Sequence, residues 1–274
     1  MQGKRVLITG GNSGIGLIAA RKLAAAGAEV ILACRDSDKT RQALEVIGAG
    51  AEIAPVNLAV DLASLASVRE LAATFLARYD RLDVLINNAG IMPAEQVITE
   101  DGFEMQMAVN HLSHFLLTHL LLDCLKVSAP ARIVNVSSMM HKKGEMDLAT
   151  FTGFHKYKMQ AAYSQSKLAN MMFTVELAER LNGSGVTVNA LHPGAVATDI
   201  VRSFPWLVRK IVGLLFISPE KGAKTTMMLA SDPELEAVSG KYYDQCKLAG
   251  YSPVADDNLQ RDAFWAASTK AVGL

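Results

Sequence analysis

The sequence predicts a single α/β domain in which a parallel, doubly wound sheet carries helices on both faces. Short apolar runs typical of buried strands alternate with helical segments, the order expected of a parallel sheet. A glycine-rich loop separates the first strand from the first helix. The 274 residues suit one large domain, and no composition shift, repeat or low-complexity linker suggests a second. We therefore expect one domain over residues 1–274.

The composition excludes some partners and indicates a compartment. The 27 basic and 27 acidic side chains balance, which leaves no electrostatic footprint for nucleic acid. Cys34, Cys124 and Cys246 are odd in number and lack C-x-x-C spacing, as reduced thiols do. A strand begins at Lys4, and no later apolar run reaches the roughly 18 residues of a membrane span. We expect a cytoplasmic protein without signal peptide, anchor or integral membrane segment.

The first strand, residues 4–9, leads into Thr9-Gly-Gly-Asn-Ser-Gly-Ile-Gly16 and then into a helix that stops at Gly27. Glycines let the backbone turn sharply and approach a pyrophosphate, and the helix N-terminus offers unpaired N–H groups. The spacing, G-x-x-x-G-x-G, differs from the common G-x-G-x-x-G pattern. Residues 11–15 also lack the last glycine of a G-x-S-x-G nucleophile elbow. The loop therefore predicts phosphate binding, not a serine hydrolase.

The second strand, residues 29–33, ends in Cys34-Arg35-Asp36. An acid at this strand end binds the ribose 2′-hydroxyl of NAD, whereas a nearby Arg accommodates the 2′-phosphate of NADP. Cys34 stands where the acid would be, and Arg35 follows it. We predict NADP(H) over NAD(H), although Asn12 and Ser13 of the glycine loop supply no second basic group.

The middle of the chain continues the alternation. We expect a helix over 37–47, a strand over 52–57, a helix over 64–79 and a strand over 83–86. The last strand runs into Asn87-Asn-Ala-Gly90, where small residues let the backbone close over a flat ligand and Asn88 can hold neighbouring strands together.

Residues 102–127 form a segment that is apolar nearly all round. Such a helix is buried, either in the core or against another subunit. His111, His114 and His119 on it lack H-E-x-x-H spacing and an evident third ligand, so we predict no metal site.

A strand over 131–136 delivers Ser137 and Ser138 to its C-terminal end, where ligands of open α/β sheets bind. A long loop separates Ser138 from Tyr163, 25 residues later. Tyr163 and Lys167 lie four residues apart on a helix running to about Leu181, hence on one face. A fixed ammonium favours the phenolate, so we expect Lys167 to lower the pKa of Tyr163. The pair then suits general acid/base work between a carbonyl and an alcohol.

The C-terminal third contains a strand over 186–191, followed by His192-Pro-Gly-Ala-Val-Ala-Thr198. Residues 204–216 are apolar and partly basic, as in a substrate lid or a membrane-touching helix, and we place a lid region over 198–232. A helix begins at Pro219, and residues 240–243 form the last expected strand. Residues 204–216, together with Phe151, Phe154 and Tyr157 near the proposed mouth of the substrate pocket, predict a hydrophobic substrate.

The glycine loop, Asn-Asn-Ala-Gly, the strand-end Ser and Tyr-x-x-x-Lys, in this order, resemble the short-chain dehydrogenase/reductase family over essentially the whole chain. Ala33-Cys-Arg-Asp36 and Ser166-Lys-Leu-Ala-Asn170 look like its retinol-dehydrogenase-like branch. Membrane-bound members carry an N-terminal anchor, which we do not expect here. The resemblance implies a Rossmann-type parallel sheet of about seven strands with right-handed crossovers.

The resemblance also implies residue roles. Tyr163 would exchange a proton with the substrate oxygen, Lys167 would bind the nicotinamide ribose, Ser138 would hydrogen-bond the substrate carbonyl and Asn110 would hold a water in a proton relay. The implied cofactor-binding residues are Gly10, Asn12, Ser13, Gly14, Ile15, Gly16, Arg35, Asp61, Leu62, Asn88, Ala89, Gly90, Tyr163, Lys167, Pro193, Gly194, Val196 and Thr198.

These expectations describe an NADP(H)-dependent oxidoreductase that interconverts a hydrophobic ketone or aldehyde and its alcohol, in a homo-oligomer, dimer or tetramer. Two alternatives stay open. One is a membrane-associated enzyme directed at retinoids or lipids. The other is a non-catalytic NADP-binding sensor on the same fold, although a pure binder has no need of a shifted phenol.

Overall fold

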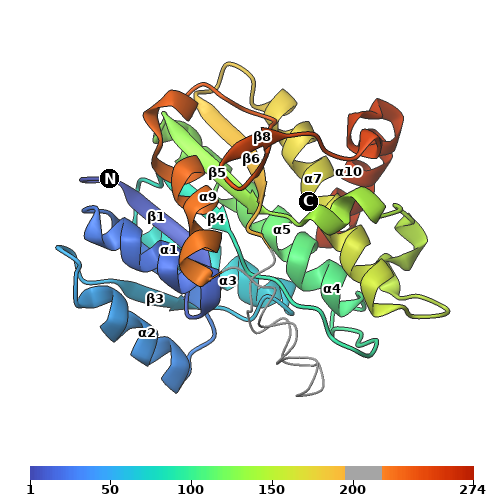
Figure 1. Cartoon of the computed structure of the whole chain (residues 1–274). Coiled ribbons are helices and arrows are strands. Elements are labelled where there is room, and N and C mark those ends of the chain that lie inside the picture. Colours follow the sequence, from blue (N-terminus) through green and yellow to red (C-terminus); the bar gives the residue numbers. More distant parts are fainter. Residues whose placement is uncertain (195–217) are drawn as a thin grey trace.

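One sheet of eight strands organises residues 1–194 and 218–274, the parts of the chain that the computed structural model describes (Figure 1). The strands are β1 (Arg5–Thr9), β2 (Glu29–Cys34), β3 (Val56–Ala59), β4 (Val84–Asn87), β5 (Ala131–Val136), β6 (Val186–His192), β7 (Tyr242–Asp244) and β8 (Lys247–Ala249). Their spatial order is β3-β2-β1-β4-β5-β6-β7-β8. Neighbours from β3 to β7 pair in parallel, and β8 pairs with β7 antiparallel. The predicted doubly wound α/β fold is confirmed, with one more strand than expected.

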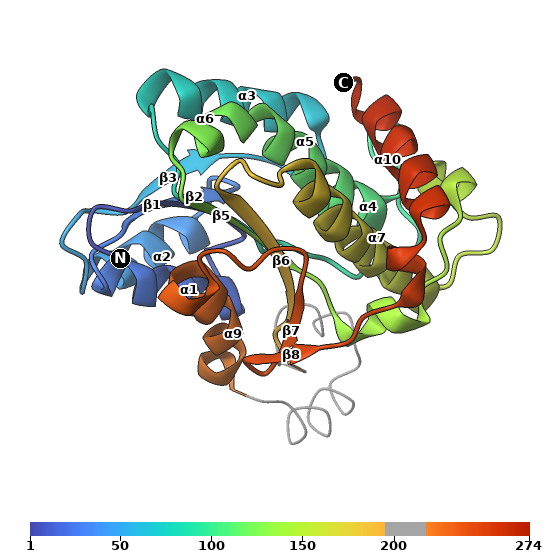
Figure 2. The same ribbon diagram turned by 90° about the horizontal axis from the view of Figure 1, so that it is seen from above.

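Helices cover both faces of the sheet. They are α1 (Gly14–Ala25), α2 (Asp38–Gly48), α3 (Leu65–Arg78), α4 (Met105–Met107), α5 (Ser113–Leu120), α6 (Leu122–Val127), α7 (Met159–Arg180), α9 (Pro219–Ser231) and α10 (Asn258–Val272). A π-helical turn, η1 (Ala108–Leu112), joins α4 to α5, and short 3-10 turns are η2 (Met139–Lys143), η3 (Leu148–Thr152), η5 (Pro233–Leu235) and η6 (Pro253–Asp256). Viewed from above, α1, α2 and α9 lie on one face of the sheet, and α3, α5, α7 and α10 on the other (Figure 2). None of the helices in the described ranges is long and apolar enough to cross a membrane.

The strands are buried on both sides, which explains their unbroken apolar sequences. In β1, Leu7 packs into the core under α3, α5 and α7, whereas Val6 and Ile8 pack into the core under α1 and α9. All three side chains are fully buried. Burial of each contributes roughly 1.5–3 kcal/mol, so the sheet is the rigid element on which the loops at its edge depend.

Strand β3 begins later than the sequence predicts, at Val56 instead of residue 52. Glu52 and Ile53 are exposed, and Pro55 precedes the first paired residue, Val56, which lies opposite Ile31 of β2. Proline has no N–H to donate to a ladder, so pairing starts only after it.

The apolar segment after Gly102 is buried within its own chain. Helix α5 packs against α3 and α10, and Phe115 lies 5.2 Å from Phe173 of α7 and 5.0 Å from Trp265 of α10, measured between ring centroids. Of the two expectations for this segment, the core and a subunit interface, the structure supports the core.

Helix α10, which the sequence did not predict, covers α5 and α7 and is joined to α7 by a partly buried ion network. The Arg261 guanidinium is 3% exposed and donates to Glu176 at 3.0 Å and to Glu179 at 2.8 Å, both on α7. The Arg180 guanidinium of α7 lies 4.2 Å from the centre of the Trp265 ring. These contacts hold α10 on the helix that carries Tyr163.

The order of the strands reverses between β1 and β4: the chain moves from β1 through β2 to β3 on one side and continues from β4 on the other. Connections leave these two strands in opposite directions, which opens a crevice beyond their carboxyl ends. The glycine loop follows β1, and Asn-Asn-Ala-Gly follows β4, so both motifs lie at this crevice.

Candidate active site

A cleft of about 820 Å³ lies at this crevice, beyond the carboxyl ends of the central strands. It brings together segments that are far apart in the sequence. The predicted site residues that line it are Gly10, Asn12, Ser13, Gly14, Ile15, Gly16, Arg35, Asp61, Leu62, Asn88, Ala89, Gly90, Tyr163, Lys167 and Pro193. Gly194, Asn110 and Ser138 do not line it, and Val196 and Thr198 lie outside the described residues.

The glycine loop is held against the end of β4 by Asn88. The Asn88 side-chain amide donates to the carbonyl oxygens of Thr9, at 2.8 Å, and of Gly10, at 3.3 Å. The main-chain N–H groups of Asn88 and Ala89 donate to the Thr9 hydroxyl at 2.9 and 3.0 Å. Asn88 therefore ties the two loops together, as the sequence suggested.

Gly16 has no room for a side chain. A Cβ atom there would lie 2.5 Å from the Gly10 carbonyl oxygen and 2.5 Å from the Asn88 amide nitrogen. The first turn of α1 thus packs directly on the backbone of the glycine loop. The N–H groups of this helical turn are the ones that would bind a phosphate.

We expect Gly16→Ala to displace the loop, lower the melting temperature and weaken nucleotide binding by at least about tenfold, since one Cβ forces backbone apart from backbone. Gly50→Ala is the matched control, because a Cβ at Gly50 meets nothing within 4 Å. Thermal unfolding with and without NADPH measures both effects. A Gly16→Ala protein that NADPH stabilises as strongly as wild type would contradict this geometry.

Beside the glycine loop, two basic residues follow β2. Arg35 and Lys39 both line the cleft and are exposed, with Ser37 between them. Lys39 was missed in the sequence, although it stands on the first turn of a helix that begins at the cleft edge. Asn12 of the glycine loop donates to Thr40 at 2.9 Å, and Thr40 donates to the Arg35 carbonyl at 2.7 Å, which fixes this turn beside the loop.

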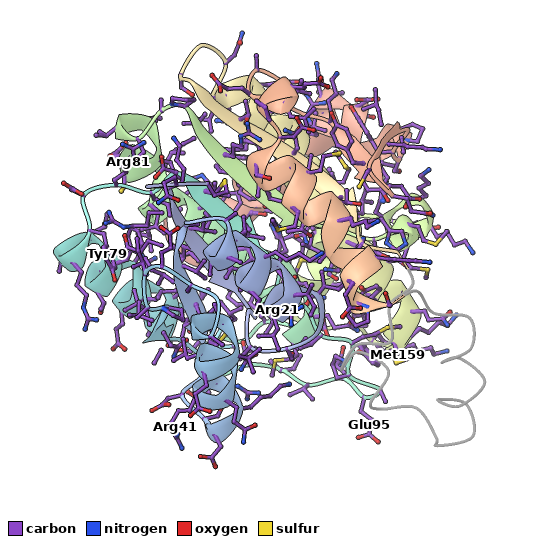
Figure 3. All side chains as sticks on the ribbon, turned by 60° about the vertical axis from the view of Figure 1, so that its left-hand side comes forward. Arg21, Arg41, Tyr79, Arg81, Glu95 and Met159 are labelled. Carbon is purple, nitrogen blue, oxygen red and sulfur yellow. The ribbon has the colours of Figure 1, made fainter. Side chains whose placement is uncertain are left out.

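Arg41, the next basic residue, is directed elsewhere. It lies on the periphery of α2 (Figure 3) and pairs with Asp36 at 3.3 Å and with Asp38. It does not line the cleft. These pairs also engage the two carboxylates that stand nearest to Arg35 in the sequence.

Tyr163 and Lys167 lie side by side on α7 and face the cleft. Tyr163 is 8% exposed and Lys167 is 2% exposed. The Lys167 ammonium donates to the Val136 carbonyl, at the end of β5, at 3.0 Å, and lies 5.6 Å from the centre of the Tyr163 ring. Ser138, two residues beyond the end of β5, is near enough to the Tyr163 hydroxyl to favour its phenolate, and its own hydroxyl accepts the Met140 N–H at 3.2 Å.

Burial is the main cause of the pKa shift of Tyr163 and of Lys167. Burial raises the pKa of Tyr163 to about 12, and the Ser138 side chain only partly opposes it. Burial also lowers the pKa of Lys167 to about 8. The expected lowering of the Tyr163 pKa is therefore not found: burial in a low-dielectric site penalises the phenolate, and Lys167 is not among the causes of the shift.

The side chain of Asn110 is fully engaged with protein. Its oxygen accepts from the Ile91 N–H at 2.8 Å, and its nitrogen donates to the Ile91 carbonyl at 3.0 Å and to Ser166 at 2.9 Å. Ser166 in turn donates to the Tyr163 carbonyl at 2.8 Å. Asn110 thus ties the loop after β4 to the helix that carries Tyr163.

Comparison with known proteins agrees with this geometry. Residues 4–205 match the family model of the short chain dehydrogenases. The chain belongs to the short-chain dehydrogenase/reductase family. It is 48% identical to human retinol dehydrogenase 13 over 282 residues, which cover 99% of this chain and 85% of that protein. It is thus an oxidoreductase of the retinol-dehydrogenase-like branch.

Two solved structures share the fold of this dehydrogenase. An uncharacterised protein of Mycobacterium paratuberculosis has a TM-score of 0.79 and 34% identity, covering 99% of this chain and 94% of that one. The RhlG protein of Pseudomonas aeruginosa, in a complex with NADP, has a TM-score of 0.72 and 26% identity, covering 89% of this chain and 95% of that one.

The aromatic residues expected at the mouth lie elsewhere. Phe151 is 4% exposed and belongs to the hydrophobic core, 6.4 Å from Phe264 between ring centroids. Phe154 packs on Tyr157, whose hydroxyl donates to the Pro93 carbonyl at 2.8 Å. None of the three lines the described part of the cleft, so they lend the substrate prediction no support. The apolar residues that do line it beside Tyr163 are Ile91, Met105, Val109 and Val136.

The three histidines of residues 102–127 contact protein groups. His111 lies 3.0 Å from the Ser268 hydroxyl, His119 lies 2.7 Å from the Phe115 carbonyl oxygen, and His114 contacts Thr9. Within residues 1–194 and 218–274, no group of three or more His, Cys, Asp or Glu side chains could hold a metal ion.

The low pKa of Lys167 predicts a rise in stability with pH. The unfolded chain keeps the Lys167 proton up to its ordinary pKa of 10.5, whereas the folded dehydrogenase releases it near 8. Between these values the unfolded state binds more protons, so raising the pH from 8 to 10 favours the fold. We expect wild type to gain on the order of 2 kcal/mol relative to Lys167→Met over this range.

Urea unfolding of both proteins at several pH values measures this gain. Lys241→Met, at an exposed lysine, is the control and should follow wild type. Above pH 10 the trend should reverse, because the folded state keeps the Tyr163 proton longer than the unfolded state does. Equal slopes for wild type and Lys167→Met from pH 8 to 10 would contradict the buried ammonium.

Proposed function

We propose that this dehydrogenase is an NADP(H)-dependent enzyme that interconverts a hydrophobic ketone or aldehyde and its alcohol by hydride transfer, with Tyr163 as the general acid/base. One observation carries the proposal. A single cleft has a phosphate cradle and two cations at one end and the Tyr163–Lys167 pair with apolar walls at the other. An NADP(H) molecule has a matching arrangement, because its 2′-phosphate and its reactive nicotinamide ring lie at opposite ends.

The chain's residues fit such a cofactor. The contact of Gly16 with Gly10 and Asn88 leaves a backbone cradle that any Cβ would fill. Arg35 and Lys39 would hold a 2′-phosphate, Asp61 and Leu62 would flank the adenine, and Lys167 would bind the nicotinamide ribose. The bound cofactor supplies the hydride, so the protein contributes position and charge stabilisation.

Tyr163 would donate the proton that the substrate oxygen needs during reduction. With a pKa of about 12 the phenol is protonated throughout the physiological range, which supports the acid role. Ser138, which is near the Tyr163 hydroxyl, would hold the substrate carbonyl beside it. The Lys167 ammonium would steady the negative charge that develops on the phenol oxygen.

The proposed substrate class is supported by the apolar side chains of Ile91, Met105, Val109 and Val136 beside Tyr163. The relatives named as retinol dehydrogenases favour a second candidate, a membrane-associated enzyme directed at retinoids or lipids. Co-flotation with liposomes separates the two. A non-catalytic sensor is disfavoured, because binding alone does not require Ser138, Tyr163 and Lys167 together.

Three further proposals concern the compartment, the assembly and the domain organisation of the protein. A reducing compartment, the cytoplasm, is supported by the free cysteines Cys34, Cys124 and Cys246. A homo-oligomer, dimer or tetramer, would have to assemble away from the face of α5 and α7 that α10 covers. We also propose a single domain over residues 1–274 with a lid region at 198–232. Within the described part of the lid region, α9 packs on α1. Residues 204–216, the apolar part of the proposed lid, lie outside the described residues.

The test is NADPH oxidation with a panel of carbonyl compounds. We expect medium-chain aldehydes, ring ketones and retinaldehyde to be reduced, and polar triols not to be oxidised in the reverse direction. Turnover that favours sugars over apolar carbonyls would overturn the substrate class. Nucleotide binding without turnover of any carbonyl would favour the sensor.

A further inference from the structure

Thr9 and His114 make a buried contact between the cofactor loops and the helix of Asn110. Thr9 ends β1 and is fully buried, and His114, on α5, is 2% exposed. The Thr9 hydroxyl oxygen lies 2.8 Å from His114 Nε2, and His114 Nδ1 lies 3.1 Å from the main-chain oxygen of Asn110. One imidazole ring therefore connects two parts of the site that are more than a hundred residues apart in the chain.

The surrounding hydrogen bonds fix which ring nitrogen carries the proton. The Thr9 oxygen already accepts the N–H groups of Asn88 and Ala89, so its own hydrogen must go elsewhere. His114 Nε2, at 2.8 Å, is a much closer acceptor than the Ile86 carbonyl, at 3.5 Å. Nε2 is then an acceptor, and the proton sits on Nδ1, where it donates to the Asn110 carbonyl.

A neutral ring agrees with its surroundings. Burial, together with the charge of Lys167, lowers the pKa of His114 to about 4, although the bond to Asn110 opposes this. The opposite tautomer would aim a third donor at the Thr9 oxygen and would leave Nδ1, without a hydrogen, against a carbonyl. Both contacts would become repulsive.

Asn110 is the residue through which this contact reaches the helix of Tyr163. Its side chain bonds Ile91 and Ser166, and Ser166 donates to the Tyr163 carbonyl. Asn110 lies in the π-helical turn η1, whose hydrogen-bond ladder differs from that of a regular helix. The Nδ1–H group of His114 donates to the carbonyl of this turn at 3.1 Å.

We propose that His114 is a positioning residue with two separable tasks: through Nε2 it holds Thr9 and the nucleotide-binding loops, and through Nδ1–H it holds Asn110, whose side chain is linked through Ser166 to Tyr163. The inference rests on the proposed function for the second task. The first task concerns nucleotide binding and the folded protein alone.

The tautomer can be measured without any substrate. In protein labelled with nitrogen-15 at histidine, we expect His114 to show a protonated Nδ1 and an unprotonated Nε2 from about pH 6 to 8. A protonated Nε2, or titration of the ring within this range, overturns the proposal.

Amide side chains can replace one ring nitrogen at a time. His114→Asn places its NH₂ near the position of Nδ1, and His114→Gln places its oxygen near that of Nε2. We expect His114→Asn to weaken NADPH binding at least about fivefold with kcat nearly unchanged, and His114→Gln to lower kcat by a similar factor with the NADPH Kd nearly unchanged. His114→Leu should lose both.

Thr9→Val and Thr9→Ser provide the matched pair on the other side of the contact. Thr9→Val should weaken NADPH more than His114→Asn does, because it also removes the acceptor of the Asn88 and Ala89 N–H groups, and Thr9→Ser, which keeps the hydroxyl, should bind NADPH as wild type does. If the Asn and Gln variants changed Kd and kcat by the same factors, or if folded His114→Leu changed neither, His114 would have no positioning role. If wild type turns over no carbonyl, the proposed function fails, while the tautomer and the NADPH affinities still decide the first task.

Discussion

Replacement of Tyr163 by Phe is expected to lower kcat at least about 100-fold, the lower range of a general-acid effect, and to leave the NADPH affinity nearly unchanged. The variant removes one hydroxyl from a side chain that is 8% exposed, while the ring keeps its place on α7. Steady-state kinetics with an apolar aldehyde and titration of NADPH measure the two quantities separately.

The matched control is Tyr251→Phe. The Tyr251 hydroxyl donates to Asp256 at 2.7 Å, and Tyr251 does not line the cleft, so its loss should leave kcat unchanged. If Tyr163→Phe kept more than about a tenth of the wild-type kcat, another group would have to supply the proton. If it instead lost NADPH binding, Tyr163 would serve the cofactor more than the substrate.

Arg35→Ala is expected to weaken NADPH binding by about 10- to 150-fold and to leave NADH nearly unchanged, because a guanidinium bond to a phosphate contributes roughly 1.5–3 kcal/mol. Lys39→Ala should weaken NADPH less, since an exposed ammonium acts as a hydrated point charge. Both residues are exposed, so the preference should shrink as salt rises. Dissociation constants of both cofactors at low and high salt measure it.

Arg41→Ala is the control for charge alone. It removes a cation from the same segment, but Arg41 pairs with Asp36 and Asp38 and does not line the cleft. It should change the NADPH affinity little. Adding Cys34→Asp to Arg35→Ala should invert the preference, because a carboxylate there repels the phosphate and binds the ribose hydroxyl. Equal wild-type affinities for NADH and NADPH at low salt would contradict the roles of both cations.

The parts of the fold that were predictable depend on local patterns. Buried parallel strands are continuous apolar runs, so β1, β2, β4, β5 and β6 were visible in the sequence. Strand β8 was not, because it has three residues, Leu248 is 66% exposed, and the turn before it uses Gln245 and Cys246 at positive φ in place of the usual Asn-Gly. Helix α10 is held by tertiary contacts, among them those of Arg261 with α7 and of Trp265 with Phe115 of α5, which no local pattern shows.

Site residues that belong to a local sequence motif could be predicted. Residues whose role depends on neighbours from distant parts of the chain could not. The glycine loop, Asn88, Tyr163 and Lys167 were expected to meet, and the structure places all of them at one cleft. Lys39 and His114 gain their significance only from neighbours such as Arg35 and Thr9, which no local pattern shows. The Tyr163 pKa was misjudged because spacing reveals the ammonium but not the depth of burial.

The central claim, hydride transfer to a carbonyl in this cleft, is tested most directly by an isotope. Wild type is incubated with an apolar aldehyde and NADPH deuterated at the reactive carbon of the nicotinamide ring, on either face in separate reactions. We expect deuterium from one of the two faces to appear in the alcohol, as measured by mass spectrometry, and none with Tyr163→Phe over the same time. An alcohol that carries no deuterium from either face, or no alcohol at all with any carbonyl of the panel, would contradict the account.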